Sequence, residues 1–454
     1  MTLSRLNLTL IGVLLLGYAF LDRGFAYIGF GSFFVGEFVL VVTILITVIN
    51  TIHPRSLTNP ISYTLLAFLF WSICILVFNT SGRWMDALRD SVIWGYAFYA
   101  ILVASLLLRT RSVDSSLSWY GRWMPWFALW AAPVFVLQLT IRGIVPNIPG
   151  TGVNLFYIKA GDVAVHLAGA LTFLMLGLHR VYWRNSGKWS YFKEIMCYSA
   201  VLLGIVATGS RNRGGLMSFL LAVAIVTIFR PNNRFTRFLF PATVVVLLLI
   251  AFEVSIPTGG GREISLHQIA DNIQSVFMHS DERLLSGTVD WRLQWWNGII
   301  KDTVFGDNFW HGTGFGASLA DRYGFADGTT NRSPHNGHLT ILAREGVPGF
   351  ILWVILVLTI FANLTRSYFT ALSANQPNVA RVNLWVMAYL AAFLANMSFD
   401  VYLEGPQGGI WFWCLVGFAI ALTTTQRANA MARSGAGPTR VSIATPNSGV
   451  MHRK

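Results

Sequence analysis

Two histidines lie in a short polar stretch just before a long apolar run, in the sequence Ser333-Pro334-His335-Asn336-Gly337-His338. Serine is favoured as a helix N-cap and proline at the first helical position, so the spacing predicts His335 and Asn336 in the first turn of a helix. His338 would then share a face with His335. A helix N-terminus attracts phosphate and disfavours imidazolium, so we expect a neutral histidine that acts as a general base near pH 7. The alternative interpretation is that these polar residues only cap a helix.

A second polar stretch separates two apolar runs and carries two arginines: Gly209-Ser210-Arg211-Asn212-Arg213-Gly214-Gly215. Glycine lets the backbone approach a ligand closely, and the arginine guanidinium group matches phosphate oxygens. The pattern therefore predicts a diphosphate cradle in which Arg211, Arg213 and Ser210 take part. The alternative is an ordinary polar turn whose arginines reach lipid headgroups.

A third stretch, Trp291-Arg292-Leu293-Gln294-Trp295-Trp296, precedes Gly312-Thr313-Gly314-Phe315-Gly316. Arg292 beside Trp295 would bind a phosphate or a sugar, or anchor the segment at a membrane interface. The glycine pattern has no preceding strand and no ribose-binding acid after it, which argues against a dinucleotide site. Asp400 and Glu404 flank a helix end and are expected to be structural, although one of them could orient a catalytic histidine.

The elements that position these residues are membrane helices. The chain has 454 residues, of which 54% are hydrophobic and only 12% charged, and apolar runs of about twenty residues recur. The net charge of +13 is therefore interpreted through membrane topology, and no nucleic-acid partner is expected. We expect about twelve transmembrane helices in an all-α integral membrane protein, near residues 7–21, 33–51, 61–79, 92–108, 124–141, 162–179, 194–209, 215–229, 238–255, 336–362, 382–400 and 409–425.

Lysine and arginine are more frequent in the loops on the side of the termini, which predicts cytoplasmic N and C termini. One connection, residues 256–334 between the ninth and tenth helices, is far longer than a turn and falls on the opposite, periplasmic face. Apolar residues at helical spacing predict an amphipathic helix in it, and the tryptophans at 291–296 predict a second helix. We therefore expect this loop to form an ordered cap.

The chain divides by these features into an N-terminal membrane part (1–193), a catalytic membrane part (194–425) that includes the loop 256–334, and a disordered cytoplasmic tail (426–454). The three cysteines lie inside apolar runs. The sequence shows no Walker motif, HExxH, paired cysteine ligands or GxSxG. We therefore expect no metal and no cofactor.

Taken together, these motifs resemble the O-antigen ligase and polymerase superfamily of bacterial envelope enzymes. Its ligases share a signature of His, then Asn, Ser or Gln, nine residues, Gly, two residues, then Gly, Thr or Tyr. This chain matches it with His335-Asn336, Gly346 and Gly349. The turn around Arg211 and the loop with Arg292 and Gly312-Thr313-Gly314 also resemble features of the superfamily.

The resemblance implies an enzyme of the inner membrane that transfers a glycan at the periplasmic face without a metal and with inversion at the anomeric carbon. The donor would be an undecaprenyl-diphosphate-linked glycan, and the acceptor a sugar hydroxyl of lipid A–core or of a growing polysaccharide. His335, Arg211 and Arg292 take the catalytic roles by this resemblance. Arg213, Asn336, His338, Ser210 and Trp295 are the expected substrate contacts, and membrane lipids are the expected surroundings.

Two alternatives stay open on the residues. The complete ligase-type spacing favours a ligase, while a polymerase of O-antigen or exopolysaccharide repeat units needs the same donor chemistry. The glycines and Pro348 in the stretch from Arg344 to Gly349 predict a break in the helix at this point. A transporter is the more distant alternative, since broken helices also occur in transporters. The polar groups gather on one outer face around a long loop, which favours surface chemistry over transport.

Overall fold

The computed structural model describes residues 2–30, 33–82, 84–141, 143–183, 188–229, 235–258, 262–277, 283–326 and 332–433. The helices of the bundle within these ranges are α1 (Leu3–Ala26), α2 (Val35–Asn50), α3 (Pro54–Leu57), α4 (Pro60–Phe78), α5 (Trp84–Gly95), α6 (Phe98–Thr110), α7 (Val113–Ile141), α8 (Ala160–Met175), α9 (Leu178–Tyr182), α10 (Lys188–Gly209), α11 (Arg213–Phe229), α12 (Phe235–Ala251), α16 (Gly337–Ser373), α17 (Pro377–Met397) and α18 (Pro406–Arg433). A 3-10 turn, η1 (Tyr402–Glu404), precedes α18.

Among the described helices, seven are long and apolar enough to cross a membrane: α1, α4, α7, α10 from Tyr191, α16, α17 and α18. The pair α5–α6 passes the same test but is bent by 43° at its break, where the sequence predicted one continuous helix. Four further apolar helices are shorter: α2, α8, α11 and the part of α12 from Phe240 to Ala251. Each of the twelve predicted ranges overlaps one of these helices or the bent pair. A mostly helical membrane fold is confirmed, while twelve crossings and the periplasmic placement of the long loop stay predictions.

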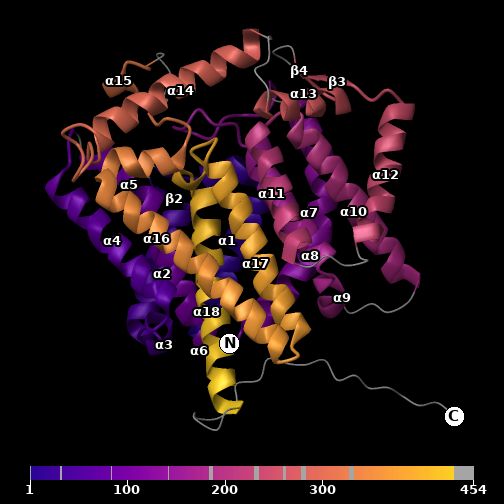
Figure 1. Cartoon of the computed structure of the whole chain (residues 1–454), viewed down its shortest axis with the longest axis horizontal. Coiled ribbons are helices and arrows are strands. Elements are labelled where there is room, and N and C mark those ends of the chain that lie inside the picture. Colours follow the sequence, from indigo (N-terminus) through magenta and orange to yellow (C-terminus); the bar gives the residue numbers. More distant parts are fainter. Residues whose placement is uncertain are drawn as a thin grey trace.

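A cap lies over one end of the bundle, at the top of Figure 1, with the N-terminus toward the other end. Its elements are β3 (Ile256–Thr258), β4 (Arg262–Ile264), α13 (Leu266–Phe277), α14 (Arg283–Val304) and α15 (Leu319–Tyr323). The two predicted helices in this loop are present as α13 and α14. The cap has its own apolar cluster, in which Trp295 and Ile299 of α14 pack against Leu342 and Ala343 of α16. We call these five elements the cap below.

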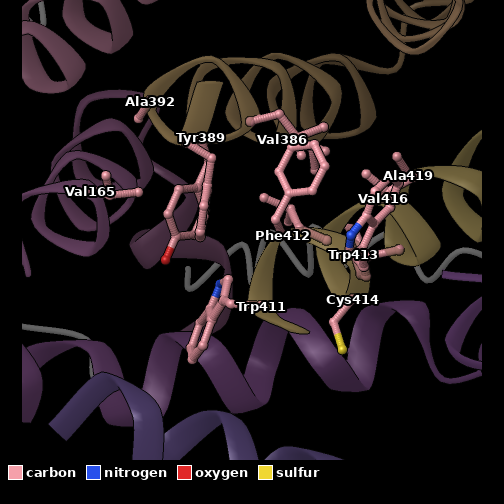
Figure 2. Packing of buried hydrophobic residues seen from close by; sticks show 14 of the residues in the cluster. Val165, Val386, Tyr389, Ala392, Trp411, Phe412, Trp413, Cys414, Val416 and Ala419 are labelled. Atoms are coloured by element: carbon pink, nitrogen blue, oxygen red, sulfur yellow. The ribbon is translucent and has the colours of Figure 1, made fainter. Parts of the chain in front are cut away.

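The centre of the bundle is formed by α8, α17 and α18. Figure 2 shows Val165 of α8 and Tyr389 of α17 near the aromatic run that begins at Trp411 of α18. The Tyr389 hydroxyl forms a hydrogen bond with His166 Nδ1 at 2.7 Å, which satisfies a polar pair inside this apolar core. Helix α18 continues to Arg433, so the predicted disordered tail does not begin at 426. Its remaining residues, 434–454, lie outside the described part of the chain.

Helix α16 breaks at Gly346, as the sequence predicted for the segment 344–349. Gly346 has φ +72° and ψ −175°, which no other residue adopts without strain. A Cβ there would lie 2.6 Å from the Phe309 carbonyl oxygen and 2.9 Å from the Gly312 nitrogen. The break therefore separates a short helix, which directly follows His335 and Asn336, from a longer membrane helix.

Replacement of Gly346 by alanine should lower the free energy of unfolding by about 2–4 kcal/mol, because it adds backbone strain and a steric clash. Thermal unfolding of the purified protein in detergent measures this as a lower Tm. Gly324→Ala is the matched control, since Gly324 also has φ +75° but no atom lies within 4 Å of its Cβ position. Equal Tm losses in the two variants would contradict a tightly enclosed break.

Candidate functional site

His335 lies just before α16, not inside its first turn. Asn336 is the N-cap, and its side-chain oxygen accepts hydrogen bonds from the His338 and Leu339 backbone nitrogens at 3.1 and 3.2 Å. The helix therefore starts at Gly337, and the prediction of Ser333 as N-cap was wrong. Asparagine caps a helix as well as serine does, and the Ser333 hydroxyl instead donates to Glu404 Oε2 at 2.7 Å. His335 has φ +53°, a turn conformation that projects its side chain away from the helix.

The His335 imidazole faces a buried carboxylate. Its Nδ1 lies 3.7 Å from Asp400 Oδ1, and the two side chains are 30% and 6% exposed. The other oxygen of Asp400 forms an ion pair with the Lys159 ammonium group. Burial raises the pKa of Asp400, but Lys159 and the His335 contact lower it more, so the pKa lies well below its usual range. Asp400 is therefore a carboxylate that can fix the orientation of His335.

Further buried charges extend from Lys159 into the first helix. The Lys159 backbone nitrogen donates to Asp22 Oδ2 at 2.6 Å. Arg23 Nε lies 4.0 Å from Asp162 Oδ2, which also accepts from Gln407 at 3.0 Å. Asp22 has φ +46° and interrupts α1, so its side chain leaves the regular helix surface to make this contact. We call Asp22, Arg23, Lys159, Asp162 and Asp400 the charge cluster.

The cap covers His335 from the other side. The Trp296 indole nitrogen donates to the Pro334 carbonyl oxygen at 2.9 Å, and the Trp291 ring lies 6.1 Å from the His335 ring. Arg292, on the same helix, is half-buried, and its Nε has no hydrogen-bond partner among the described residues. Burial lowers the pKa of Arg292, and the Asp400 carboxylate opposes this effect. Arg292 thus presents an unused cationic donor within electrostatic range of the His335–Asp400 pair.

The turn at 209–215 is tied to the cap. Arg211 Nη1 donates to the Thr258 carbonyl oxygen of β3 at 3.3 Å and also contacts the Thr258 hydroxyl. The Asn272 side chain of α13 donates to the Gly209 and Ser210 carbonyl oxygens, each at 2.9 Å. These bonds fix the conformation of the turn and orient the Arg211 side chain toward the cap.

The turn 209–215 and the start of α16, next to His335, both pack closely against residues 396–399. A Cβ on Gly214 would lie 2.9 Å from Phe399 Cβ, and a Cβ on Gly337 would lie 2.7 Å from Met397 Cε. Gly161, beside Lys159, approaches the Asn212 side chain in the same way, at 3.2 Å. Three segments far apart in sequence therefore meet next to Asp400, beneath the cap.

The comparison with known families fits this geometry. Residues 198–354 match the family model described as O-antigen ligase. No curated protein matches the chain at a significant level. Over these residues the chain is similar to the O-antigen ligase family. The O-antigen ligase region contains the turn, the cap and His335, while Lys159 and Asp400 lie on either side of it.

The O-antigen ligase signature now has a structural meaning at each position. His335 faces Asp400, Asn336 caps the helix, and Gly346 makes the break. Gly349 has no room for a side chain, because a Cβ there would lie 2.9 Å from both Glu345 Oε2 and Trp71 Nε1. Asn336 and Gly346 therefore set the two ends of the short helix, Gly349 packs closely against its last turn, and His335 directly precedes it.

Three residues that are expected to contact substrate also make internal contacts. His338 accepts a hydrogen bond from Trp353 at 3.0 Å, and its other nitrogen lies 3.3 Å from the Leu394 carbonyl oxygen. Trp295 is fully buried and stacks on Phe325. Ser210 is buried, and its single hydroxyl hydrogen is shared between the carbonyl oxygens of Val206 at 2.7 Å and Ser265 at 3.1 Å. These contacts give all three packing roles in the site. Ser210 and Trp295 are buried and His338 is partly exposed, and their contact with substrate stays a prediction.

Arg213 is the first residue of α11 and is half-buried. Its side chain therefore remains partly accessible at the turn 209–215. Asp22, Arg23, Lys159 and Asp162 are the residues of the charge cluster that sequence reasoning missed. One signal was available for Lys159: it is a cation on the face where the loops carry few of them, directly before the apolar helix that begins Ala160-Gly161-Asp162. Nothing comparable marks Asp22 inside the first apolar run.

The described residues contain no group of three or more His, Cys, Asp or Glu side chains placed to hold a metal ion. The cationic groups near His335 are instead side chains of arginine and lysine. Such groups suit an anionic phosphate and repel a metal cation. Metal independence itself stays a prediction.

Proposed function

We propose that this protein transfers a glycan from undecaprenyl diphosphate to a sugar hydroxyl at the His335 site. The family match supports a membrane glycosyltransferase of the O-antigen ligase and polymerase type. The observation that supports the site best is the His335–Asp400 pair beneath the cap, within electrostatic range of Arg292, whose Nε has no hydrogen-bond partner among the described residues. A base oriented by a carboxylate and a free cationic donor are the two groups that this reaction requires.

The donor is already activated, because diphosphate is a good leaving group. Arg292 and Arg211 bind its oxygens and stabilise the negative charge that grows as the bond between the anomeric carbon and the phosphate oxygen breaks. Arg213 supports this binding from the same turn. Guanidinium groups suit this task because they remain charged and hydrogen-bond two oxygens at once.

Asp400 holds the proton of His335 on Nδ1, which leaves Nε2 as an acceptor. Nε2 takes the proton from the acceptor hydroxyl while the hydroxyl oxygen forms a bond to the anomeric carbon. The electron pair of the broken bond leaves with undecaprenyl diphosphate. Attack from the side opposite the leaving group inverts the anomeric centre.

The site lies at one end of the bundle, so a lipid-linked donor reaches it by lateral diffusion along the bilayer surface. We place this end at the periplasmic face and the termini in the cytoplasm, on the distribution of lysine and arginine between the loops. The reaction is tested with purified protein in liposomes that contain an undecaprenyl-diphosphate-linked glycan and an acceptor. We expect glycan on the acceptor and release of undecaprenyl diphosphate, both unchanged by a metal chelator. No transfer to any glycan acceptor would overturn the proposal.

The acceptor distinguishes a ligase from a polymerase. The complete signature favours a ligase that moves polymer onto lipid A–core. Deletion of the gene in its host should then remove all polymer from an otherwise normal lipopolysaccharide core. Single repeat units left on the core would identify a polymerase instead.

The roles of Lys159 and Asp400 can be separated by a double variant. Lys159→Met leaves the Asp400 carboxylate buried without its ion-pair partner and should destabilise the protein by about 3 kcal/mol, measured as a lower Tm. Lys159→Met combined with Asp400→Asn removes both charges and should recover most of that stability. We expect the double variant to stay about 10²-fold less active, because His335 has lost its orienting carboxylate. Full activity in the double variant would show that Asp400 serves only the fold.

A further inference from the structure

A second polar-rimmed site lies at the end of the bundle opposite the cap. There α1, α6, α7, α17 and α18 surround a cavity of about 700 Å³. Its inner end is lined by aromatic and apolar side chains, among them Tyr389, Trp411 and Cys414, which Figure 2 shows in the core of the bundle. A cavity with such walls favours an apolar occupant over water. Its volume is within the range of about 300–1,000 Å³ typical of small-ligand sites.

The mouth of this cavity is cationic. Arg5 of α1 and Arg111, which follows α6, are both exposed there, next to the hydroxyl-bearing residues Ser112, Ser115 and Ser116. No aspartate or glutamate is among the described residues that line it. Arginine keeps its charge at any physiological pH. The rim therefore complements an anionic group that also accepts hydrogen bonds, such as a phosphate.

The depth of the cavity matches one leaflet of a bilayer. Its lining on α1 runs from Arg5 to Leu15, which is a rise of ten residue steps and, at about 1.5 Å per step, about 15 Å. The hydrocarbon core of a bilayer is about 30 Å thick, so this is about half of it. The cavity thus extends from a charged interface to the middle of the membrane.

We propose that this cavity binds an anionic phospholipid, with the headgroup phosphate between Arg5 and Arg111 and one acyl chain along the apolar interior. Charge complementarity at the rim and the length of one leaflet both select this occupant. The lipid-linked donor is a different molecule at a different place, since its diphosphate belongs under the cap. The inference depends on membrane insertion of the chain and not on the glycosyl transfer reaction, so the two can fail separately.

Native mass spectrometry of the full-length protein, delipidated in detergent and titrated with phosphatidylglycerol or phosphatidylcholine, tests this site. We expect a retained phosphatidylglycerol adduct that phosphatidylcholine does not compete away. Arg5→Gln combined with Arg111→Gln should weaken this adduct about tenfold or more, since each arginine contributes to anionic-lipid attraction. Ser116→Trp should weaken it as well, because the indole fills the cavity.

Arg366→Gln is the matched control, since Arg366 is an exposed arginine on α16 that does not line the cavity. It should leave the adduct unchanged. Loss of the adduct in the double arginine variant but not in Ser116→Trp would show surface attraction only and overturn the proposal. So would an adduct that survives both changes. Adducts are compared only between variants whose Tm equals that of the wild type. If Ser116→Trp does not fold, Thr9→Trp replaces it as the cavity-filling change.

Discussion

Replacement of His335 by asparagine is expected to lower glycan transfer by about 10²–10⁴-fold, the range for loss of a general base. Asparagine is the informative substitution because His335 has φ +53°, a conformation that asparagine adopts more readily than alanine does. Activity is then lost with the imidazole and not through backbone strain. Initial rates in liposomes measure the effect, with the Tm in detergent as the check on folding.

His267→Asn is the matched control for this variant. His267 lies in α13 of the same cap, its side chain is 83% exposed, and it pairs with Asp271 within its own helix. We expect wild-type rates from it. If His335→Asn also retained wild-type rates, a catalytic role for His335 would be excluded, and the pair with Asp400 would be structural.

Replacement of Arg292 by glutamine should lower kcat/KM for the lipid-linked donor by about 10²–10³-fold, because a charged donor to the leaving diphosphate is lost. Its Nε makes no hydrogen bond within the described protein, so the substitution breaks no such bond of this atom and should leave the Tm nearly unchanged. Arg292→Lys should recover only part of the activity, because an ammonium group cannot hold two phosphate oxygens in the guanidinium geometry.

Arg322→Gln controls for the loss of one positive charge from the cap. Arg322 lies on α15, is 41% exposed and pairs with Asp302 at 3.3 Å, so its removal should not change transfer. Equal losses in the two variants would indicate that the cap acts only through its total charge. Arg211→Gln is harder to interpret, because Arg211 also joins the turn to Thr258. It should lower both the activity and the Tm.

The helices were predictable because apolar runs of membrane length dominate the sequence, and a helix satisfies every backbone polar group inside a bilayer. The break at Gly346 was predictable for a similar reason, since the glycines and Pro348 between Arg344 and Gly349 disfavour a continuous helix. The start of α16 was not, because serine, asparagine and proline give competing cap signals within four residues. Which residue becomes the N-cap depends on Glu404, which lies in a distant part of the chain and accepts a hydrogen bond from the Ser333 hydroxyl.

The charge cluster shows why the site was only partly predictable. His335, Arg211 and Arg292 lie in polar stretches where their types and neighbours carry a signal. Asp22 lies within an apolar helix, and nothing local relates it to Lys159 or Asp400. Such buried pairs are set by which helices pack together, and α1 packs against both α8 and α18. Periodicity along one helix does not contain that information.

The interruption of α1 at Asp22 also limits how the site can be transplanted. A chimera that exchanges residues 198–354 between relatives carries His335 and both arginines of the proposed donor site. It leaves Asp22, Lys159 and Asp400 to the recipient. The transferred His335 would then face the recipient's own residues at positions 400 and 159. An active chimera should therefore require these three positions to come from the same protein as residues 198–354. The catalytic region and the surrounding membrane helices would then have to be exchanged together.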